Sequence, residues 1–219
     1  WSELFPKALL IGLDIDLEGE ESLNFDKIII GNPGDIRQQL LIKGIQEILE
    51  NHKANNNGKR LLLTMAPETA YVHGGLSDWA VANVYGGAYL PIIEALREDI
   101  DMMNVQLYNS GEMLALDGKV YKEGTVDWVV ALTEAVILGF KSKGAIGTYS
   151  GLPANKVGVA LPGCHSADAV PHAELESVMR YLLGVGEQPG KYVLKTGGGY
   201  PDLKGMMTWS INSDRTCSP

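Results

Sequence analysis

The sequence is poor in cysteine, in basic residues relative to acidic ones, and in long hydrophobic runs. Its two cysteines, Cys164 and Cys217, exclude a disulfide-dense scaffold and a four-cysteine zinc site. Eighteen Lys and Arg against 27 Asp and Glu leave a formal net charge of −9, which argues against nucleic acid as a partner. No apolar run approaches the roughly 18 residues that a membrane-spanning helix needs. We therefore expect a soluble protein with no membrane partner.

The composition is that of a folded chain: 45% of the residues are hydrophobic and 21% are charged. At 219 residues, and with no Pro-rich linker or low-complexity segment, residues 1–219 are expected to form a single domain. The chain starts at Trp1 rather than at Met, from which we expect processing or further sequence upstream. The absence of a signal peptide therefore has no bearing on export.

Strand-like and helix-like patterns alternate along the chain, which predicts parallel β/α units and an α/β fold. Asp35 and Thr125 precede two of the helical patterns as candidate N-caps. The run 27–31 is strand-like but lies where a loop is expected. Strands are predicted at 8–17, 60–66, 102–108, 157–161 and 205–211, and helices at 35–51, 90–100, 126–140 and 173–183.

The sharpest chemical signal is the segment Gly12-Leu13-Asp14-Ile15-Asp16-Leu17-Glu18. On a strand, Asp14, Asp16 and Glu18 share one face, with same-face neighbours about 6.6 Å apart. Crowding raises the pKa of at least one carboxyl group, which is how an acid stays protonated near neutral pH. Glu18, nearest the loop, is the natural general acid. The alternatives are a solvated strand edge or a divalent-cation site with oxygen ligands.

Three further motifs place polar or aromatic groups at the ends of predicted strands. Alone, each is weak: the acid after Pro67 could lie in a surface loop, and the tryptophan could belong to the core or form a platform for a sugar ring. The motifs are Met65-Ala66-Pro67-Glu68, Asn104-Val105-Gln106-Leu107-Tyr108-Asn109 and Met207-Thr208-Trp209.

Taken in order, the four motifs resemble glycoside hydrolase family 18, the bacterial chitinases in particular, over nearly the whole chain from Leu9 to Asn212. The resemblance implies a (β/α)₈ TIM barrel. In the family the acidic motif normally ends the fourth strand and the tryptophan motif the eighth, so this chain is expected to supply only the C-terminal five β/α units. Its open edges would then need the missing barrel half or self-association. The family pattern usually has an Asp where this chain has Ile11.

The resemblance also implies roles for the motif residues. Glu18 would protonate the glycosidic oxygen, and the substrate's own acetamido oxygen would be the nucleophile, giving net retention. Asp16 would orient the acetamido group, Asp14 would share a proton with Asp16, and Tyr108 would donate a hydrogen bond to the acetamido carbonyl. No metal or organic cofactor is expected. The expected substrate-binding residues are Met65, Ala66, Glu68, Gln106, Asn109 and Trp209.

The function that the resemblance implies is a secreted chitinase acting on chitin or N-acetylglucosamine oligosaccharides. An endo-β-N-acetylglucosaminidase acting on N-glycans, a non-catalytic chitin-binding lectin and an inactive truncated barrel remain alternatives. Two other expectations concern single residue types. Cys164 and Cys217 either pair or, as the default, remain free thiols, and the four histidines (52, 73, 165 and 172) are ordinary surface or loop residues.

Overall fold

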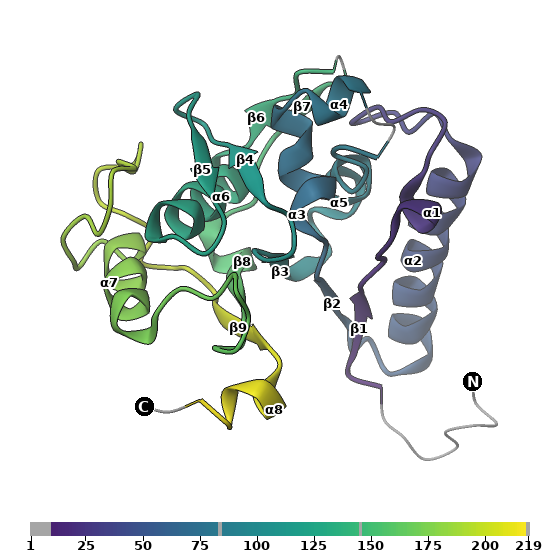
Figure 1. Cartoon of the computed structure of the whole chain (residues 1–219). Helices are drawn as coiled ribbons and strands as arrows, with labels where there is room; N and C mark the ends of the chain where they lie inside the picture. The colour runs from purple at the N-terminus through teal and green to yellow at the C-terminus, as the bar shows by residue number, and fades with distance from the viewer. Residues whose placement is uncertain (1–9, 83–84, 145, 218–219) are drawn as a thin grey trace.

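The computed structural model describes residues 10–82, 85–144 and 146–217, and its centre is a five-stranded parallel sheet (Figure 1). The spatial order of the strands is β1-β2-β3-β8-β9, the order in which they occur along the chain. The strands are β1 (Gly12–Ile15), β2 (Leu62–Met65), β3 (Ile100–Gln106), β8 (Val157–Pro162) and β9 (Gly205–Trp209). The α/β class is confirmed, and the five predicted strands all exist.

Each connection between neighbouring strands passes through helix, as parallel pairing requires. The longer helices are α2 (Ile36–Asn55), α5 (Leu90–Leu96), α6 (Val126–Leu138) and α7 (His172–Leu182). The shorter helices are α1 (Glu20–Leu23), α3 (Thr69–Val72), α4 (Trp79–Ala82) and α8 (Ile211–Asp214), with 3₁₀ turns at His73–Leu76 and Ala154–Lys156. None of the helices in the described part of the chain has the length and hydrophobicity to cross a membrane.

Both predicted caps are present. The Asp35 side chain accepts a hydrogen bond from the backbone N–H of Arg37 (2.7 Å) at the start of α2. The Thr125 side chain accepts one from Trp128 N–H (3.3 Å) at the start of α6. Each satisfies a backbone donor that has no partner within the helix, and so defines where that helix begins.

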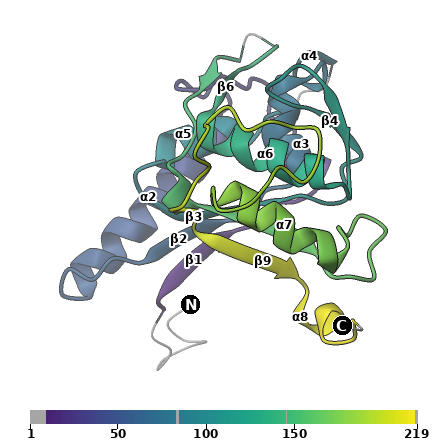
Figure 2. The ribbon, with the colours of Figure 1, turned by 90° about the vertical axis from the view of Figure 1, so that its left-hand side faces the viewer.

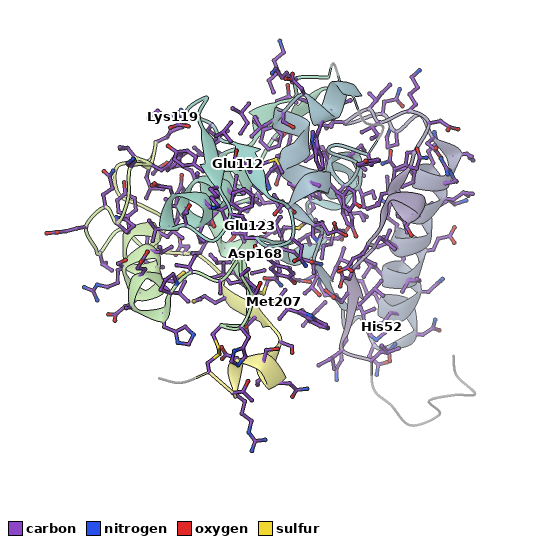
Figure 3. All side chains as sticks on the ribbon, viewed as in Figure 1. His52, Glu112, Lys119, Glu123, Asp168 and Met207 are labelled. Carbon is purple, nitrogen blue, oxygen red and sulfur yellow. A yellow bond between two sulfur atoms is a disulfide. The ribbon has the colours of Figure 1, made fainter. Side chains whose placement is uncertain are left out.

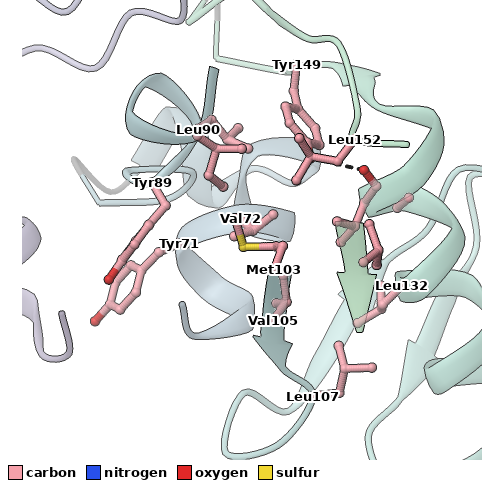
Figure 4. Packing of buried hydrophobic residues seen from close by; sticks show 14 of the residues in the cluster. Tyr71, Val72, Tyr89, Leu90, Met103, Val105, Leu107, Leu132, Tyr149 and Leu152 are labelled. Atoms are coloured by element: carbon pink, nitrogen blue, oxygen red, sulfur yellow. Dashed lines mark hydrogen bonds between the residues drawn. The ribbon is translucent and has the colours of Figure 1, made fainter. Parts of the chain in front are cut away.

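The core lies between the sheet and the helices, which cover one face (Figure 2). Leu63, Met103 and Val159 point into it from neighbouring strands, and all three are fully buried. Figure 4 shows Met103 below Val72, with Leu132 to one side of Met103 and Val105 in the same buried cluster. The opposite face is less covered: Leu62 is 46% exposed, and Asp14 is also exposed. The sheet is therefore apolar and buried on its helix side only.

Two antiparallel hairpins between β3 and β8 have no counterpart in the predicted elements. They are β4 (Glu112–Leu114) with β5 (Val120–Lys122), and β6 (Phe140–Lys141) with β7 (Thr148–Tyr149). The strand-like run 27–31 is a loop, in which Ile30 N–H donates to Ile146 O (2.6 Å).

Candidate active site

The three acids of the first strand lie on the uncovered side. β1 ends at Ile15, yet the alternation continues to residue 18: Asp14, Asp16 and Glu18 are exposed, Ile15 is buried, and Leu17 packs against the core. The carboxylates thus stand at the carboxyl end of an edge strand, where the active sites of parallel β/α folds are found.

Gln106, the last residue of β3, connects two of these acids. Its Nε2 lies 3.1 Å from Asp16 Oδ1, 2.7 Å from Glu18 Oε1 and 2.8 Å from the carbonyl oxygen of Ala66. Gln106 is 5% exposed, so its amide is held by packing as well as by these bonds. An amide nitrogen has two hydrogens for these three acceptors. One of the three acceptor oxygens therefore lacks a hydrogen from the amide. A proton on the carboxyl group of Asp16 or Glu18 can fill that place.

The pKa of Asp16 is raised by partial burial of its carboxyl group and by the negative charges of Glu18 and Asp14, against the hydrogen bond from Gln106. The pKa of Glu68 is raised by burial and by the charge of Glu18, against a hydrogen bond from Gly19 N–H (3.4 Å). Burial and the neighbouring carboxylates raise the pKa of Tyr108 to about 12. The site can hold a proton among its acids, and Tyr108 remains a hydroxyl donor at neutral pH.

A pocket of about 160 Å³ opens beside these groups. It brings together seven of the ten residues expected at the site and adds Met207, which belongs to the tryptophan motif. Trp209 is 68% exposed at its edge, so one large aromatic surface is free to meet a ligand. The lining residues are Asp16, Glu18, Ala66, Gln106, Tyr108, Asn109, Met207 and Trp209.

Three expected residues do not line this pocket. Asp14 lies further back on the strand, where it accepts a hydrogen bond from the hydroxyl of Thr64 on β2. Glu68 follows β2 and binds Gly19 N–H at the end of the acid segment. Met65 is 0% exposed and points into the core, because it falls on the helix-facing side of β2. Met65 therefore cannot contact a ligand in the pocket, contrary to expectation.

The loop that carries Asn109 is held by two carboxylates that the motifs did not include (Figure 3). Asn109 has a positive φ of 56°, and its N–H donates to Asp168 Oδ2 (3.3 Å). The Glu123 carboxylate accepts hydrogen bonds from the N–H groups of Ser110 and Gly111. These contacts fix the turn directly after Tyr108.

The tryptophan end of the sheet is crosslinked. Cys164, in the loop after β8, forms a disulfide with Cys217, beyond α8, so the expectation of free thiols is wrong. The backbone adds Gly163 N–H donating to Trp209 O (2.8 Å), and His165 Nε2 lies 2.8 Å from Thr216 Oγ1. The sequence alone could not distinguish pairing from free thiols, since connectivity depends on distance in the fold.

The disulfide also removes a potential metal ligand. Among the described residues, the two sets of three potential ligands that converge on one point are Cys164, His165 and Cys217, and His172, Asp214 and Cys217. Both need the sulfur of Cys217, which is bonded to Cys164 and is not available as a thiolate. The acids at the pocket form no such set.

The expectation that all four histidines are surface or loop residues fails at His73. This side chain is fully buried, with Nε2 2.9 Å from the carbonyl oxygen of Leu132, and burial lowers its pKa to about 4. It is a neutral core residue between the turn after α3 and helix α6, and it lies outside the pocket lining.

Known chitinases resemble this chain in sequence and in structure. No model of a known protein family matches the chain. Over 211 residues, however, it is 39% identical to Chitinase D of Niallia circulans and 38% identical to Chitinase Chi52 of Paenibacillus xylanexedens. The crystal structure of a family GH18 chitinase from Chromobacterium violaceum matches with a TM-score of 0.71 and 33% identity. The chain is thus similar to curated chitinases in sequence and to a family 18 chitinase in structure.

The matches cover unequal shares of this chain and of the similar proteins. The alignments span 93% of this chain but 38% of each of the two curated chitinases. The structural match spans 94% of this chain and 51% of the Chromobacterium violaceum chain. This chain thus aligns with only part of the length of each of these proteins.

Proposed function

We propose that this chain supplies the acid-bearing part of a chitinase that cleaves β-1,4-linked N-acetylglucosamine polymers with retention. The observation that carries the proposal is the convergence of Asp16, Glu18 and Tyr108 on one pocket with an exposed tryptophan at its edge. The names of the relatives support the same substrate class.

In the proposed reaction, protonated Glu18 donates its proton to the glycosidic oxygen as the bond to C1 breaks. The acetamido oxygen of the same sugar bonds to C1, so the electron pair of the broken bond leaves with the departing sugar. Asp16, next to Glu18, stabilises the positive charge that develops on the acetamido group, and the Tyr108 hydroxyl holds the acetamido oxygen. Water then attacks C1 and breaks its bond to the acetamido oxygen, whose electron pair returns to the acetamido group. The water gives a proton to Glu18, which restores the enzyme, and the two displacements together retain the configuration.

A protein nucleophile is the competing mechanism, and Glu68 is the carboxylate that could serve. Its carboxylate is bonded to Gly19 N–H, and the residue does not line the pocket. This placement favours the acetamido oxygen of the substrate.

We further propose that the five strands are the last five of a (β/α)₈ barrel. The sheet is parallel in sequential order, one face carries the helices, and β1 and β9 each pair with a single strand in the described part of the chain. The uncovered face with Asp14 and Leu62 would then look into the barrel interior. Three upstream β/α units of the same protein are the proposed partner for both edges, with self-association as the alternative.

An extracellular location fits the Cys164–Cys217 bond, because disulfides persist in oxidising compartments. It also fits a polymeric substrate that cannot enter a cell.

The test compares fully acetylated chitin oligomers with fully deacetylated ones of equal length, using the full-length protein. We expect cleavage of the acetylated oligomers alone, because a free amine at C2 offers no carbonyl oxygen for attack. Comparable rates on both would contradict substrate assistance and point to Glu68. Binding of acetylated oligomers without any cleavage would indicate a lectin, and neither binding nor cleavage an inactive barrel.

A further inference from the structure

The backbone that joins the two pocket acids is held by a side chain outside the pocket. The ladder between β1 and β2 ends with Ala66 N–H donating to Ile15 O (3.0 Å). Beyond it, Leu17 separates Asp16 from Glu18. The Leu17 N–H donates to the hydroxyl oxygen of Tyr89 (2.6 Å), and the same hydroxyl lies 3.2 Å from the Leu17 carbonyl oxygen, to which it donates. One phenol thus satisfies both backbone groups of Leu17.

Tyr89 is itself rigidly placed. It is 0% exposed, immediately precedes α5, and donates its backbone N–H to Tyr71 O (3.0 Å). The carbonyl of the preceding residue, Ala88, accepts a hydrogen bond from the buried side chain of Gln38 (3.0 Å). Figure 4 shows the Tyr89 ring beside that of Tyr71, with both hydroxyls pointing the same way out of the packed cluster. A phenol ring has only two side-chain torsions, so a fixed backbone and a buried ring fix the hydroxyl.

The hydroxyl also keeps its proton. Burial raises the pKa of Tyr89 well above its ordinary value, and the charges of Asp16, Asp14 and Glu18 act in the same direction. It therefore remains both a donor and an acceptor at neutral pH, as its two contacts with Leu17 require.

We propose that Tyr89 is a positioning residue for the general acid: its hydroxyl fixes the backbone between Asp16 and Glu18 and thereby aims the Glu18 carboxyl group at the pocket. This inference rests on the proposed function, because it assigns Tyr89 a part in the proton transfer by Glu18. Without the hydroxyl, the segment after Ile15 keeps the contacts of Gln106 with the two carboxylates and of Glu68 with Gly19, but loses its backbone anchor. Small errors in the position of a proton donor are costly in rate.

The test replaces Tyr89 by Phe, which removes the hydroxyl and keeps the ring. The matched control is Tyr149→Phe, since Tyr149 is 1% exposed and its hydroxyl donates to a backbone carbonyl, that of Val136 (3.0 Å). Two substrates are compared with the full-length protein: an unactivated chitin oligomer, and a dinitrophenyl glycoside whose leaving group needs little protonation. For Tyr89→Phe we expect kcat on the oligomer to fall by about 10- to 100-fold with KM unchanged. On the dinitrophenyl substrate we expect a change within about 3-fold, because general acid catalysis contributes little there.

Equal losses on both substrates, or the same loss in Tyr149→Phe, would overturn the positioning role and leave Tyr89 as a packing residue. If the unmodified protein cleaved neither substrate, the proposed function itself would have failed. Carbon-13 NMR of the labelled Glu18 carboxyl group would still test Tyr89 in that case. Its signal should shift in Tyr89→Phe and not in Tyr149→Phe, and an unshifted signal would refute the proposal. Should Tyr89→Phe fold poorly, an amide-to-ester exchange at Leu17 removes the same hydrogen bond from the other side.

Discussion

The two edge strands of the sheet each end in site residues, but they hold them in different ways. The acid segment after β1 is anchored from below, by Leu17 packed on the core and by the buried Tyr89 hydroxyl. The tryptophan segment at the end of β9 has large exposed side chains, with Trp209 68% and Ile211 75% accessible, and the chain that follows it is held by a disulfide. A proton donor needs a defined direction, which buried hydrogen bonds provide. A platform for a sugar ring needs an exposed flat side chain, and the crosslink that holds its segment can lie several residues away.

The largest effect is expected from Glu18→Gln at the acid end. The amide keeps the shape of the side chain but has no acidic proton to give, so hydrolysis of unactivated chitin oligomers should fall by about 10²–10⁴-fold. Oligomer binding and melting temperature should stay near their original values, as measured by calorimetry. Full turnover in this variant would show that another group is the acid.

A smaller effect, of another kind, is expected from replacing Cys164 and Cys217 by Ser. Closing a loop of 53 residues restricts the unfolded chain, so losing the bond should lower the unfolding free energy by about 2–4 kcal/mol. Because the bond joins the segments that follow β8 and β9, and Trp209 ends β9, KM for oligomers should rise more than kcat falls. A larger fall in kcat than rise in KM would mean that the disulfide also affects the acid segment. Denaturant unfolding and steady-state kinetics on the same samples provide both numbers.

The smallest effect is expected from Asp16→Asn, and it is a gain in stability. The folded-state pKa of Asp16 is raised above its ordinary value of 3.8, so the folded protein binds the proton more tightly than the unfolded chain does. Stability is therefore lost as pH rises from about 3.8 through the raised pKa, and the Asn variant avoids that loss. Because Asp16 is exposed, the gain at pH 7 should stay below about 1 kcal/mol. It should vanish below pH 3.8, and a gain that persists there would have another cause. Unfolding curves across this pH range measure it.

The sequence predicted the site better than it predicted the supports of the site. The alternation through Glu18 was visible because strand geometry places every second residue on one face. The same rule, applied to residues 62–66, assigns Met65 to the opposite face from Thr64 and Ala66. The resemblance places Met65 at the pocket because it belongs to a contiguous motif. Within a strand, however, only every second residue faces the pocket.

The side chains that hold the site in place cannot be predicted from local sequence, because they contact residues far away along the chain. Tyr89 reaches Leu17 across 72 positions, and no local pattern marks its hydroxyl as a partner. Glu134 lies in helix α6 and is fully buried, where it accepts hydrogen bonds from Tyr192 and Tyr200 and from Lys195 N–H. The sequence of the helix does not reveal these partners, because all three follow Glu134 by at least 58 positions. Residues 8 and 9 of the predicted strand 8–17 lie outside the described residues, and within 10–17 the strand is limited to Gly12–Ile15.

The disulfide has a consequence for how the sheet can open. Edge strands normally exchange their amide hydrogens by local fraying, because each is paired on one side only. β9 pairs with β8, and the Cys164–Cys217 bond joins the segments that follow these two strands. The bond therefore limits how far β9 can move away from β8 unless the loop after β8 moves with it. β1 has no covalent link of this kind, and its opening is limited by noncovalent contacts alone. The sheet thus has one edge that can open by itself and one that opens only together with its neighbour.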